Sequence, residues 1–579
     1  MLKRKSSLVL LSIAALTLSA CSKEPEEASA SALVSSEDLL KYVPADTPYL
    51  LAMPVALPDD VLDKLEPQVD VTLQMYPALI KGILTSVIAT KEAAGEEAGD
   101  LQDSIPFVDE LGSLLSIEGL RAAGIDRDSR VVMYGVGVLP VIRTTLSDGT
   151  LLEAAFARLE EAAANKMSVA TIGNYEYRFA GDDEGRVIVA IMDNELVISL
   201  VPADLSEDQL KTVLGLTLPE ENIAETRTLK HIADKYGFKD YLVGFMDIER
   251  FASVFLDDQS GVNAELLSMI DYDDSKMSDA CKNDLRSIAG IMPRIVIGYT
   301  DVNIEKLSSK AVFELRQDLA AGISTMTGPV PGLGTDQGGL FSMGMSTDFL
   351  AARDFYAGRL DAMDADPYEC EEFLDFQATV AAGREILAQP VPPVAYGFKG
   401  FLAVVEDIEG LDLQNEIPPT SIDMRLLVSI DNAEGLLAMG AMFSPELAAL
   451  DLEPDGEPVR LEMGQLAALG QTVHIAMTDD AIAVSVGEGT EDRLGAMLAA
   501  SVNDPSPFMA FEMDAARYYD SIGDAMMTDG DGDIESMHEL QEAMQAMMNM
   551  AKESLSRLSI TVDFTEHGIE LNSTLHLTQ

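Results

Sequence analysis

The sequence predicts an α+β protein, a tandem duplication of a unit in which an antiparallel sheet is covered by amphipathic helices. Apolar segments of roughly four to eight residues alternate with longer segments of helical periodicity, such as 151–163, 205–216 and 535–558. Short acidic turns, such as Asp193-Asn194-Glu195, join the apolar segments in pairs, which favours hairpins over parallel crossovers. Matching segments also recur in the same order in the two parts of the chain.

Five pairs of segments predict the duplication. They are 117–120 with 408–411, the segments opening at Arg130 and at Arg425, 188–199 with 474–485, 241–247 with 508–514, and the segments opening at Arg294 and at Arg557. The offsets between partners are 291, 295, 286, 267 and 263 residues. Strand–turn–strand pieces are common to α+β proteins, which is the alternative explanation. Five matches in one order nevertheless favour a true duplication.

The first twenty residues have the three parts of an export signal. Lys3, Arg4 and Lys5 are positive, residues 8–16 are apolar, and Leu18-Ser19-Ala20-Cys21 follows. The apolar part is too short to span a bilayer, which takes about 20 residues. The last four residues resemble the lipobox of bacterial lipoproteins. That resemblance implies cleavage before Cys21, a diacylglyceryl group on its thiol, and, because Ser22 and not Asp follows, the outer membrane in preference to the inner.

The rest of the chain divides at a stretch rich in Pro and Gly. Residues 328–339 read GPVPGLGTDQGG and lack apolar periodicity. We therefore expect a signal peptide over 1–20, a lipidated tether over 21–38, a first α+β copy over 39–328, a linker over 329–338 and a second copy over 339–579. The tether is small, polar and acidic, and we expect no second membrane anchor after it.

Composition excludes some partners. A chain of 579 residues with 47% hydrophobic content can bury two or more cores. Its formal charge of −59 repels phosphate backbones, so we expect no nucleic acid partner. An acidic solvated surface explains this charge without any acidic site.

Two cysteines remain besides Cys21. In an oxidising compartment, Cys281 and Cys370 predict one disulfide that closes a loop of about 90 residues and joins the two copies across the linker. The alternatives are two inert buried thiols or a redox pair, although the Cys-x-x-Cys spacing of a redox pair is absent.

No catalytic constellation stands out. The five histidines lie singly and lack the spacing of zinc ligands: His231, His474, His538, His567 and His576. Residues 339–344 (GLFSMG) have one residue too many before Ser342 for a Gly-x-Ser-x-Gly elbow. We therefore expect no cofactor and no enzyme activity. A hydrolase whose site converges only in three dimensions is the alternative.

An acidic loop offers a weak calcium candidate. Asp529, Asp531, Asp533 and Glu535 occupy positions 1, 3, 5 and 7 of a calcium-type loop. However, Ile534 stands where the loop needs Gly, and position 12 lacks the bidentate Glu. An acidic loop capping the next helix is favoured, and a calcium-stabilised structural lipoprotein remains a further alternative.

Methionines crowd the same region: Met526, Met527, Met537, Met544, Met547, Met548 and Met550. Spacings of three and four residues favour one apolar helix face in a core. An apolar groove is the second interpretation, and a copper site built on thioethers is the third.

Residues 43–48 (VPADTP), followed by an expected strand over 49–53, are the other recognisable stretch. They resemble the opening of several families of uncharacterised bacterial envelope proteins, which supply no catalytic residues. Together these observations predict a lipid-anchored protein on the periplasmic side of the outer membrane. We expect a non-enzymatic binding or scaffold role towards a periplasmic partner or an apolar ligand.

Overall fold

The computed structural model describes residues 37–578 apart from several short gaps. The gaps are 96–98, 164–165, 183–184, 258–259, 271, 274–275, 392, 411–418, 463–470, 527–544 and 546–547. Cys21, with the whole predicted export signal and most of the predicted tether, therefore lies outside the described residues, and so do Asp529, Asp531, Asp533 and Glu535.

All 19 described strands belong to one sheet, in which every neighbouring pair is antiparallel. Ten strands precede residue 315: β1 (Tyr49–Met53), β2 (Val131–Val136), β3 (Leu139–Thr145), β4 (Ser168–Ile172), β5 (Tyr175–Gly181), β6 (Gly185–Met192), β7 (Glu195–Pro202), β8 (Val243–Asp247), β9 (Arg294–Val302) and β10 (Lys306–Glu314). Nine follow: β11 (Phe341–Ser346), β12 (Phe398–Glu409), β13 (Ser421–Ile430), β14 (Val459–Arg460), β15 (Val473–Met477), β16 (Ala481–Val486), β17 (Met509–Asp514), β18 (Leu555–Thr565) and β19 (Gly568–Leu577). The predicted α+β class with antiparallel sheet is confirmed.

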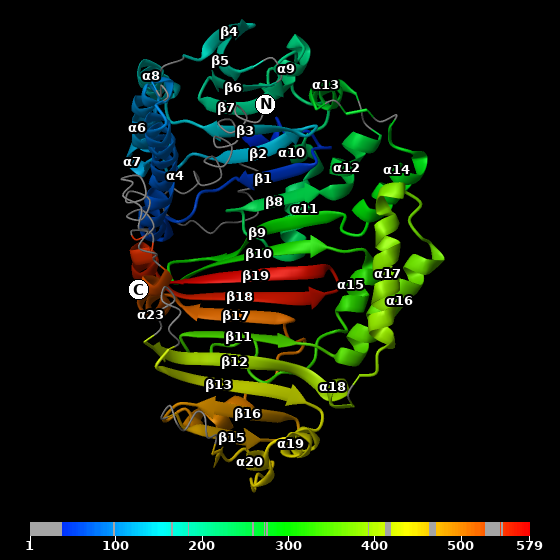
Figure 1. Cartoon of the computed structure of the whole chain (residues 1–579). Coiled ribbons are helices and arrows are strands. Elements are labelled where there is room, and N and C mark those ends of the chain that lie inside the picture. Colours follow the sequence, from blue (N-terminus) through cyan, green and yellow to red (C-terminus); the bar gives the residue numbers. More distant parts are fainter. Residues whose placement is uncertain are drawn as a thin grey trace.

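The strand order is the same on both sides of the central pair, β10 and β19 (Figure 1). Outward from β10 come β9, β8, β1, β2, β3, β7, β6, β5 and β4. Outward from β19 come β18, β17, β11, β12, β13, β16, β15 and β14. Among the described strands, only β4 has no counterpart on the other side. The two halves are thus joined edge to edge by β10 and β19.

The pairing register gives equivalent positions. Lys310 and Asn572 face each other in the central pair. Stepping outward from them, Gly298 corresponds to Thr561, Val243 to Ala510, Ala52 to Gly344, Val132 to Leu402, Arg143 to Leu427 and Val197 to Ala483. These positions give offsets of 263, 267 and 286 residues at the first, second and last correspondence, which are the offsets of three matched segments.

The other two sequence matches are wrong. Residues 117–120 begin helix α7 (Ile117–Ala122), whereas Ile408 and Glu409 end strand β12. Arg130 precedes β2, whereas Arg425 lies in β13, whose counterpart by register is β3. A four-residue match of mixed propensity is compatible with helix or strand, and tertiary context decides between them.

Helices occupy most of the connections. In the first half they are α3 (Glu37–Leu40), α4 (Asp59–Ala93), α5 (Gly99–Gln102), α6 (Ile105–Leu114), α7, α8 (Gly149–Ala162), α9 (Glu207–Val213), α10 (Ile223–Thr226), α11 (Thr228–Tyr236), α12 (Ile248–Leu256), α13 (Gly261–Met269) and α14 (Asp279–Ala289). The others are α15 (Gln317–Ile323), α16 (Phe349–Ala365), η3 (Glu371–Phe373), α17 (Leu374–Ala388), α18 (Pro393–Gly397), α19 (Ala433–Ala441), α20 (Pro445–Ala448), η4 (Glu491–Arg493), α22 (Leu494–Leu498) and α23 (Ala515–Met526).

Several helices begin directly after a strand at an Asp or Asn cap. Asp148 accepts a hydrogen bond from the Thr150 amide at the start of α8, and Asn432 accepts one from Gly435 at the start of α19. Asp247 caps α12, and Asp348 caps α16, in the same way. These side chains accept hydrogen bonds from amides that the first helical turn leaves without a partner. The start of each helix is therefore determined by residues close to it in the sequence.

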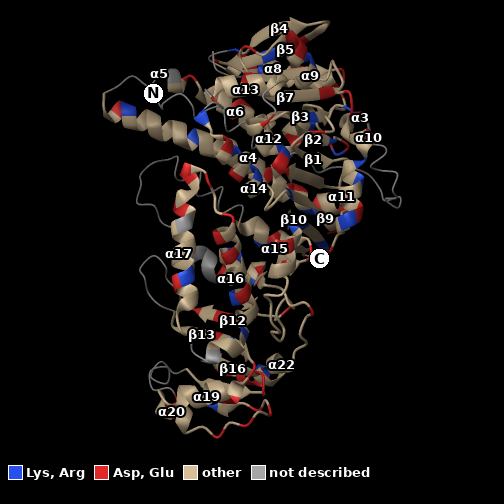
Figure 2. Cartoon of the chain, turned by 90° about the vertical axis from the view of Figure 1, so that its right-hand side faces the viewer, with Lys and Arg blue, Asp and Glu red and all other residues tan. Residues whose placement is uncertain are grey.

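The helices form layers on both sides of the sheet (Figure 2). On one side, α3, α9, α10 and α11 pack on the first half, while α22 and the segment around Val330 and Leu333 pack on the second. We call this side of the sheet the covered face. On the opposite side, α4, α7 and α8 pack near one end of the sheet, and α19 and α20 pack near the other. We call that side the open face, because the described helices cover its central strands only where the start of α4 packs on Leu307 and Leu577 (Figure 1).

The expected linker over 329–338 is not a free connection. Val330 and Leu333 are fully buried and pack against Leu402, Leu427 and Ala483 in the core of the second half. Pro and Gly abolish regular periodicity, but two apolar side chains still suffice to fix an irregular segment on a sheet.

The predicted disulfide between Cys281 and Cys370 is present. It joins the first turn of α14 to the residue that precedes η3, at a sequence separation of 89 residues. The disulfide therefore connects the helices of the two halves covalently, while β10 and β19 connect the two parts of the sheet by hydrogen bonds.

Candidate apolar binding face

The open face is apolar without interruption across the middle of the sheet. Antiparallel partners project to the same side, so a row of facing residues can be followed from strand to strand. From β2 to β13 this row is Met133, Leu51, Gly244, Ile297, Ala311, Leu571, Val562, Met509, Met345, Phe401 and Val428. Every member is apolar over eleven strands. Ser309 and Ser573, which face each other in the next row, are among the few polar residues on this side.

Burial distinguishes the two faces of β1, β9 and β11, whereas in β18 no residue on either face is buried. On the covered face, Val243, Val296 and Ala52 are fully buried. On the open face, Ile297 is 38%, Met246 42%, Met509 46% and Met343 49% exposed. Each apolar residue left in water forgoes on the order of 25 cal/mol for every Å² that could be buried. A contiguous apolar patch in the middle of a sheet is therefore typical of a surface that meets a ligand or partner.

Methionine is enriched on the open face. By register it holds Met53, Met133, Met246, Met343, Met345, Met424, Met509 and Met513. Strand β11 shows the pattern most simply, because Met343 and Met345 project to the open face while Ser342, Gly344 and Ser346 project to the covered face. The unbranched thioether adapts to different shapes, which suits a surface for flexible apolar molecules.

The sequence analysis placed its methionine-rich groove elsewhere. Most of the stretch between Met526 and Met550 lies outside the described residues, and the helix predicted over 535–558 ends before β18 begins at Leu555. The signal that could have found the open face is the two-residue period of methionine and phenylalanine in the strands at 341–345 and 509–513.

Charged groups of the central strands lie on the covered face. Glu314 of β10 accepts two hydrogen bonds from Arg294, at 2.8 and 3.0 Å, and one from Lys235 at 2.8 Å. Burial acts to raise the pKa of Glu314, but the hydrogen bonds from Arg294, Lys235 and Tyr236 outweigh it and lower the pKa to about 2. Next to it, Lys310 pairs with Glu570 across β10 and β19 at 2.7 Å. The open face of these strands carries no charge by register.

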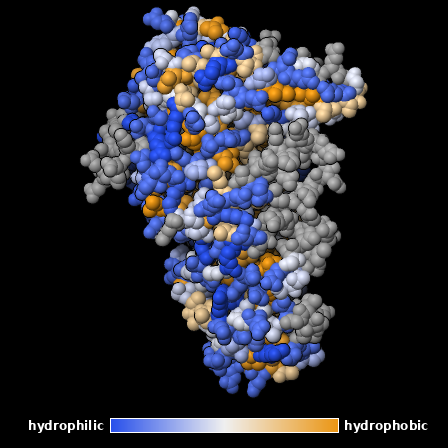
Figure 3. Space-filling view, turned by 90° about the vertical axis from the view of Figure 1, so that its left-hand side faces the viewer, coloured by the Kyte–Doolittle hydropathy of each residue, from blue (hydrophilic) through white to orange (hydrophobic). Residues whose placement is uncertain are grey.

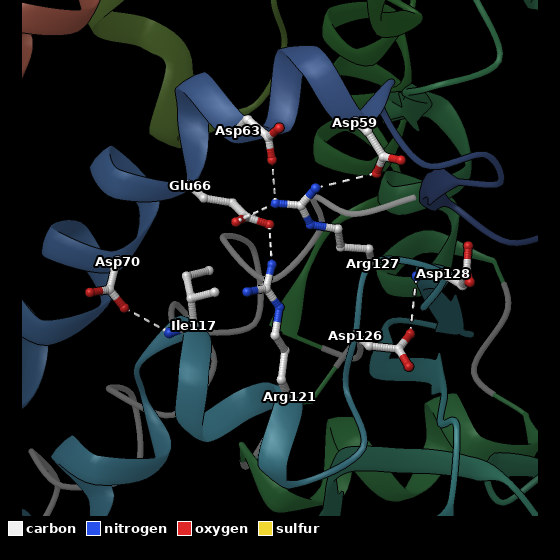
Figure 4. Close-up of polar contacts among 9 residues, drawn as sticks. All are labelled: Asp59, Asp63, Glu66, Asp70, Ile117, Arg121, Asp126, Arg127 and Asp128. Carbon is white, nitrogen blue, oxygen red and sulfur yellow. Dashed lines mark hydrogen bonds and ion pairs between the residues drawn. The ribbon is translucent and has the colours of Figure 1, made fainter. Parts of the chain in front are cut away.

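Helix α4 forms one flank of the open face and is fastened by an ionic cluster (Figure 4). Four carboxylates follow one side of the helix at spacings of three or four residues: Asp59, Asp63, Glu66 and Asp70. Arg127 contacts Asp63 at 2.7 Å and Glu66 at 2.6 Å, and Arg121 also pairs with Glu66. Asp70 accepts a hydrogen bond from the Ile117 amide at 2.7 Å. This network fixes α4 against α7.

The far end of α4 extends away from the body (Figure 2) and is apolar. Ile83 and Val87 are exposed there, and apolar atoms are visible along this projection in Figure 3. By length and composition alone α4 could cross a membrane, a test that core helices of soluble proteins also pass. In the structure, however, Leu73 is buried in a cluster with α7 and α8, so part of the helix belongs to the folded body.

The other flank is the hairpin of α16 and α17. Helix α16 has no fully buried residue. The hairpin is held by the disulfide, by the Asp284 carboxylate, which accepts from the amides of Glu369 and Cys370 at 2.8 and 2.7 Å, and by an ion pair of Arg359 with Asp318. Crosslinks at its ends therefore replace a packed core.

The other residues singled out by sequence do not converge. His231 lies on α11, His474 and His576 lie on β15 and β19, and His567 packs against Tyr236 in the turn before β19, while His538 is outside the described residues. Within the part that the structure describes, one group of three close metal-ligand atoms occurs, formed by Cys281, Cys370 and Glu372. Its two sulfurs are bonded to each other, so it is the disulfide and not a metal site.

The segment 43–48 has a structural role. Thr47 is buried, and its hydroxyl accepts a hydrogen bond from the Gly135 amide at 3.1 Å, which ties the chain to β2 just before β1. Arg250 donates to the carbonyls of Ala45 and Thr47 at 2.9 and 3.3 Å. A cavity of about 660 Å³ lies beside this segment, lined in part by Asp46 and Asn263.

No protein-family model matches the chain, and it has no significant match among curated proteins or solved structures. The site must therefore be judged by its own geometry.

Proposed function

We propose that the protein is a lipid-anchored envelope protein that binds the acyl chains of lipids, without catalysis, on the open face. The observation that carries this proposal is the unbroken apolar row from Met133 to Val428, which is partly exposed at Ile297 and Met509. An apolar surface that is kept open against its own hydrophobic cost needs an apolar occupant.

The chemistry of the face favours an acyl chain over a peptide. Strands β1, β8–β11 and β17–β19 are each paired on both sides, so no peptide can add to them as a further strand. The central strands of the open face also offer no charge and few hydroxyl groups that could recognise a polar backbone. At strand spacings of about 4.8 Å, ten steps make a row ~48 Å long, enough for more than one acyl chain end to end.

The anchor rests on the residues of the export signal. Leu18-Ser19-Ala20-Cys21 supports lipidation of Cys21, and Ser22 supports the outer membrane, facing the periplasm. The conserved arrangement of strands about the β10–β19 pair supports the further proposal that the two halves are copies of one unit. Three sequence offsets that agree with the pairing register favour this origin over chance similarity.

Fluorescence of an uncharged apolar dye, N-phenyl-1-naphthylamine, tests the proposed site. We expect the purified protein to enhance the dye's fluorescence, and palmitate to displace the dye. Ile297→Glu and Met509→Glu place charge on the open face and should weaken dye binding about tenfold or more. The matched control is Leu218→Glu, because Leu218 is 51% exposed but lies in the connection between α9 and α10.

Equal dye binding by Ile297→Glu, Met509→Glu and the control variant would reject the open face as the binding site. Displacement of the dye by an amphipathic peptide but not by palmitate would reject the acyl chain as its occupant. Circular dichroism melting of each variant establishes that it is folded.

A further inference from the structure

The turn between α19 and α20 presents the two most exposed large apolar side chains among the described residues. Phe443 is 84% and Met442 74% exposed. The turn itself is well formed, because the amide of Phe443 donates to the Gly440 carbonyl at 3.0 Å and the Ser444 hydroxyl donates to Glu446 at 2.7 Å. The two side chains are thus held outward by a defined turn.

The surroundings of this turn are almost uncharged. Residues 438–450 contain a single charged side chain, that of Glu446, in a chain that is 24% charged. Ala438, Ala448 and Ala449 are exposed alongside Met442 and Phe443. The tip is therefore an apolar, neutral projection from an otherwise strongly acidic protein.

The fold does not require an exposed apolar residue here. Helix α8 follows β3 as α19 follows β13, and their caps, Asp148 and Asn432, lie 284 residues apart, like the equivalent Arg143 and Leu427. At this offset Phe443 corresponds to Leu159, which is buried. The first half thus uses this position for its core, whereas the second half turns it towards solvent.

We propose that Met442 and Phe443 insert into the interfacial region of the bilayer that carries the lipid anchor, and so orient the body on that membrane. This inference rests on the proposed lipidation of Cys21. The turn lies on the same side of the sheet as the open face, since α19 packs there with Ile475 and Ile482. Insertion would direct the acyl-binding face towards the source of acyl chains.

The length of the tether permits this contact. The 15 residues from 22 to 36 can extend about 50 Å. Helix α3, where the tether joins the body, contacts β2, and eleven strand spacings separate β2 from β16, on which α19 packs, or ~53 Å along the sheet. The tether and the turn therefore reach the same bilayer when the long axis of the sheet is tilted from the membrane normal. Because the chain carries a charge of −59, the lipid surface it fits is zwitterionic and not anionic.

The absence of tryptophan from the chain gives a direct test. Phe443→Trp introduces a single tryptophan at the turn, and Leu218→Trp introduces one at a control position on the other half, each excited selectively at wavelengths where tyrosine does not absorb. Each lipidated variant is reconstituted into phosphatidylcholine vesicles that contain lipids brominated in their acyl chains. We expect the bromines to quench the fluorophore of Phe443→Trp at least about twofold more than that of Leu218→Trp.

The same variants with Cys21→Ser, at high vesicle concentration, separate the turn from the anchor. Quenching that persists there for Phe443→Trp supports the turn as a contact of its own, and Phe443→Asp should weaken vesicle binding of this unanchored protein ~10-fold or more. Equal quenching of the two fluorophores, or self-association abolished by Phe443→Asp without any vesicle effect, would overturn the inference. Failure of the lipidated protein to float with vesicles would reject the lipid anchor. The quenching measured with the Cys21→Ser variants would still test whether the turn contacts the bilayer.

Discussion

Helices α4 and α16 follow equivalent strands, β1 and β11, yet they are fastened in different ways. Helix α4 has 35 residues, six of them buried, and an ionic cluster at its start. Helix α16 has 17 residues, none of them buried, and depends on the disulfide and on polar contacts at its ends. One topological position is thus held by packing in the first half and by crosslinks in the second. The two flanks of the open face should therefore fail under different perturbations.

The largest effect is expected from breaking the disulfide. Replacing both cysteines, as Cys281→Ser with Cys370→Ser, frees a loop of 89 residues and should cost about 4 kcal/mol in the entropic account of crosslinks. Hydrogen exchange should rise in α16 and α17, because no residue of α16 is buried, and should stay unchanged in α4. Uniform exchange across both flanks would show that the hairpin is not held as described.

Truncation of a buried residue should have the opposite distribution. Leu73 of α4 is fully buried, so Leu73→Ala should lower the free energy of unfolding by about 2–4 kcal/mol. Leu360 of α16 is only half-buried, and Leu360→Ala should cost about 1 kcal/mol or less. Denaturant unfolding of the two variants measures the difference. Equal losses would contradict the contrast between packing and crosslinks.

The third contrast concerns two glutamates that neighbour equivalent arginines. Arg294 and Arg557 are 263 residues apart and correspond by register. Beside Arg294, the pKa of Glu314 is lowered to about 2, because hydrogen bonds from Arg294, Lys235 and Tyr236 outweigh burial. Beside Arg557, burial dominates and raises the pKa of Glu512 above its ordinary value. We expect Glu314→Gln to cost about 2 kcal/mol at neutral pH and Glu512→Gln to cost little.

The lowered pKa of Glu314 determines how its contribution to stability changes with pH. Since Glu314 has a folded pKa below its ordinary 4.5, the unfolded chain binds more protons in acid, and the stability contributed by Glu314 is present above about pH 4.5. It is lost as the pH falls towards 2. Melting temperatures of Glu314→Gln should therefore fall less steeply than those of the unsubstituted protein over that range. Parallel curves of melting temperature against pH for the two proteins would show that Glu314 is not the source of this acid-dependent loss of stability.

Some local features could be predicted because their causes are local. Acidic turns between apolar segments gave hairpins such as β6–β7, and the turn at Asp193 is present between them. The matches 188–199, 241–247 and 294–302 fell on strands whose equivalents agree in register, since each spans a whole strand or hairpin. The match at 117–120 failed because four residues do not specify helix or strand.

The candidate site was harder to foresee. A period of two, as in 341–346, reveals that a strand has two different faces, but the larger residues are normally assigned to the core. Here the small Ser342 and Gly344 face the buried side, since Leu333 and the neighbouring backbone leave no room for a side chain at position 344. Methionine and phenylalanine therefore project to the open side.

The sequence by itself determined the strand periods, the Asp and Asn caps that start the helices, the net charge of −59, and the two cysteines that pair. Each of these follows from residue types a few positions apart or from composition. Only the tertiary structure decided that β10 meets β19, that residues 329–338 belong to a core, and that the apolar side of the central strands stays open. Those outcomes depend on contacts between residues far apart in the chain, such as Ala311 with Leu571 and Val330 with Leu402, and no local pattern encodes which face a distant helix will cover.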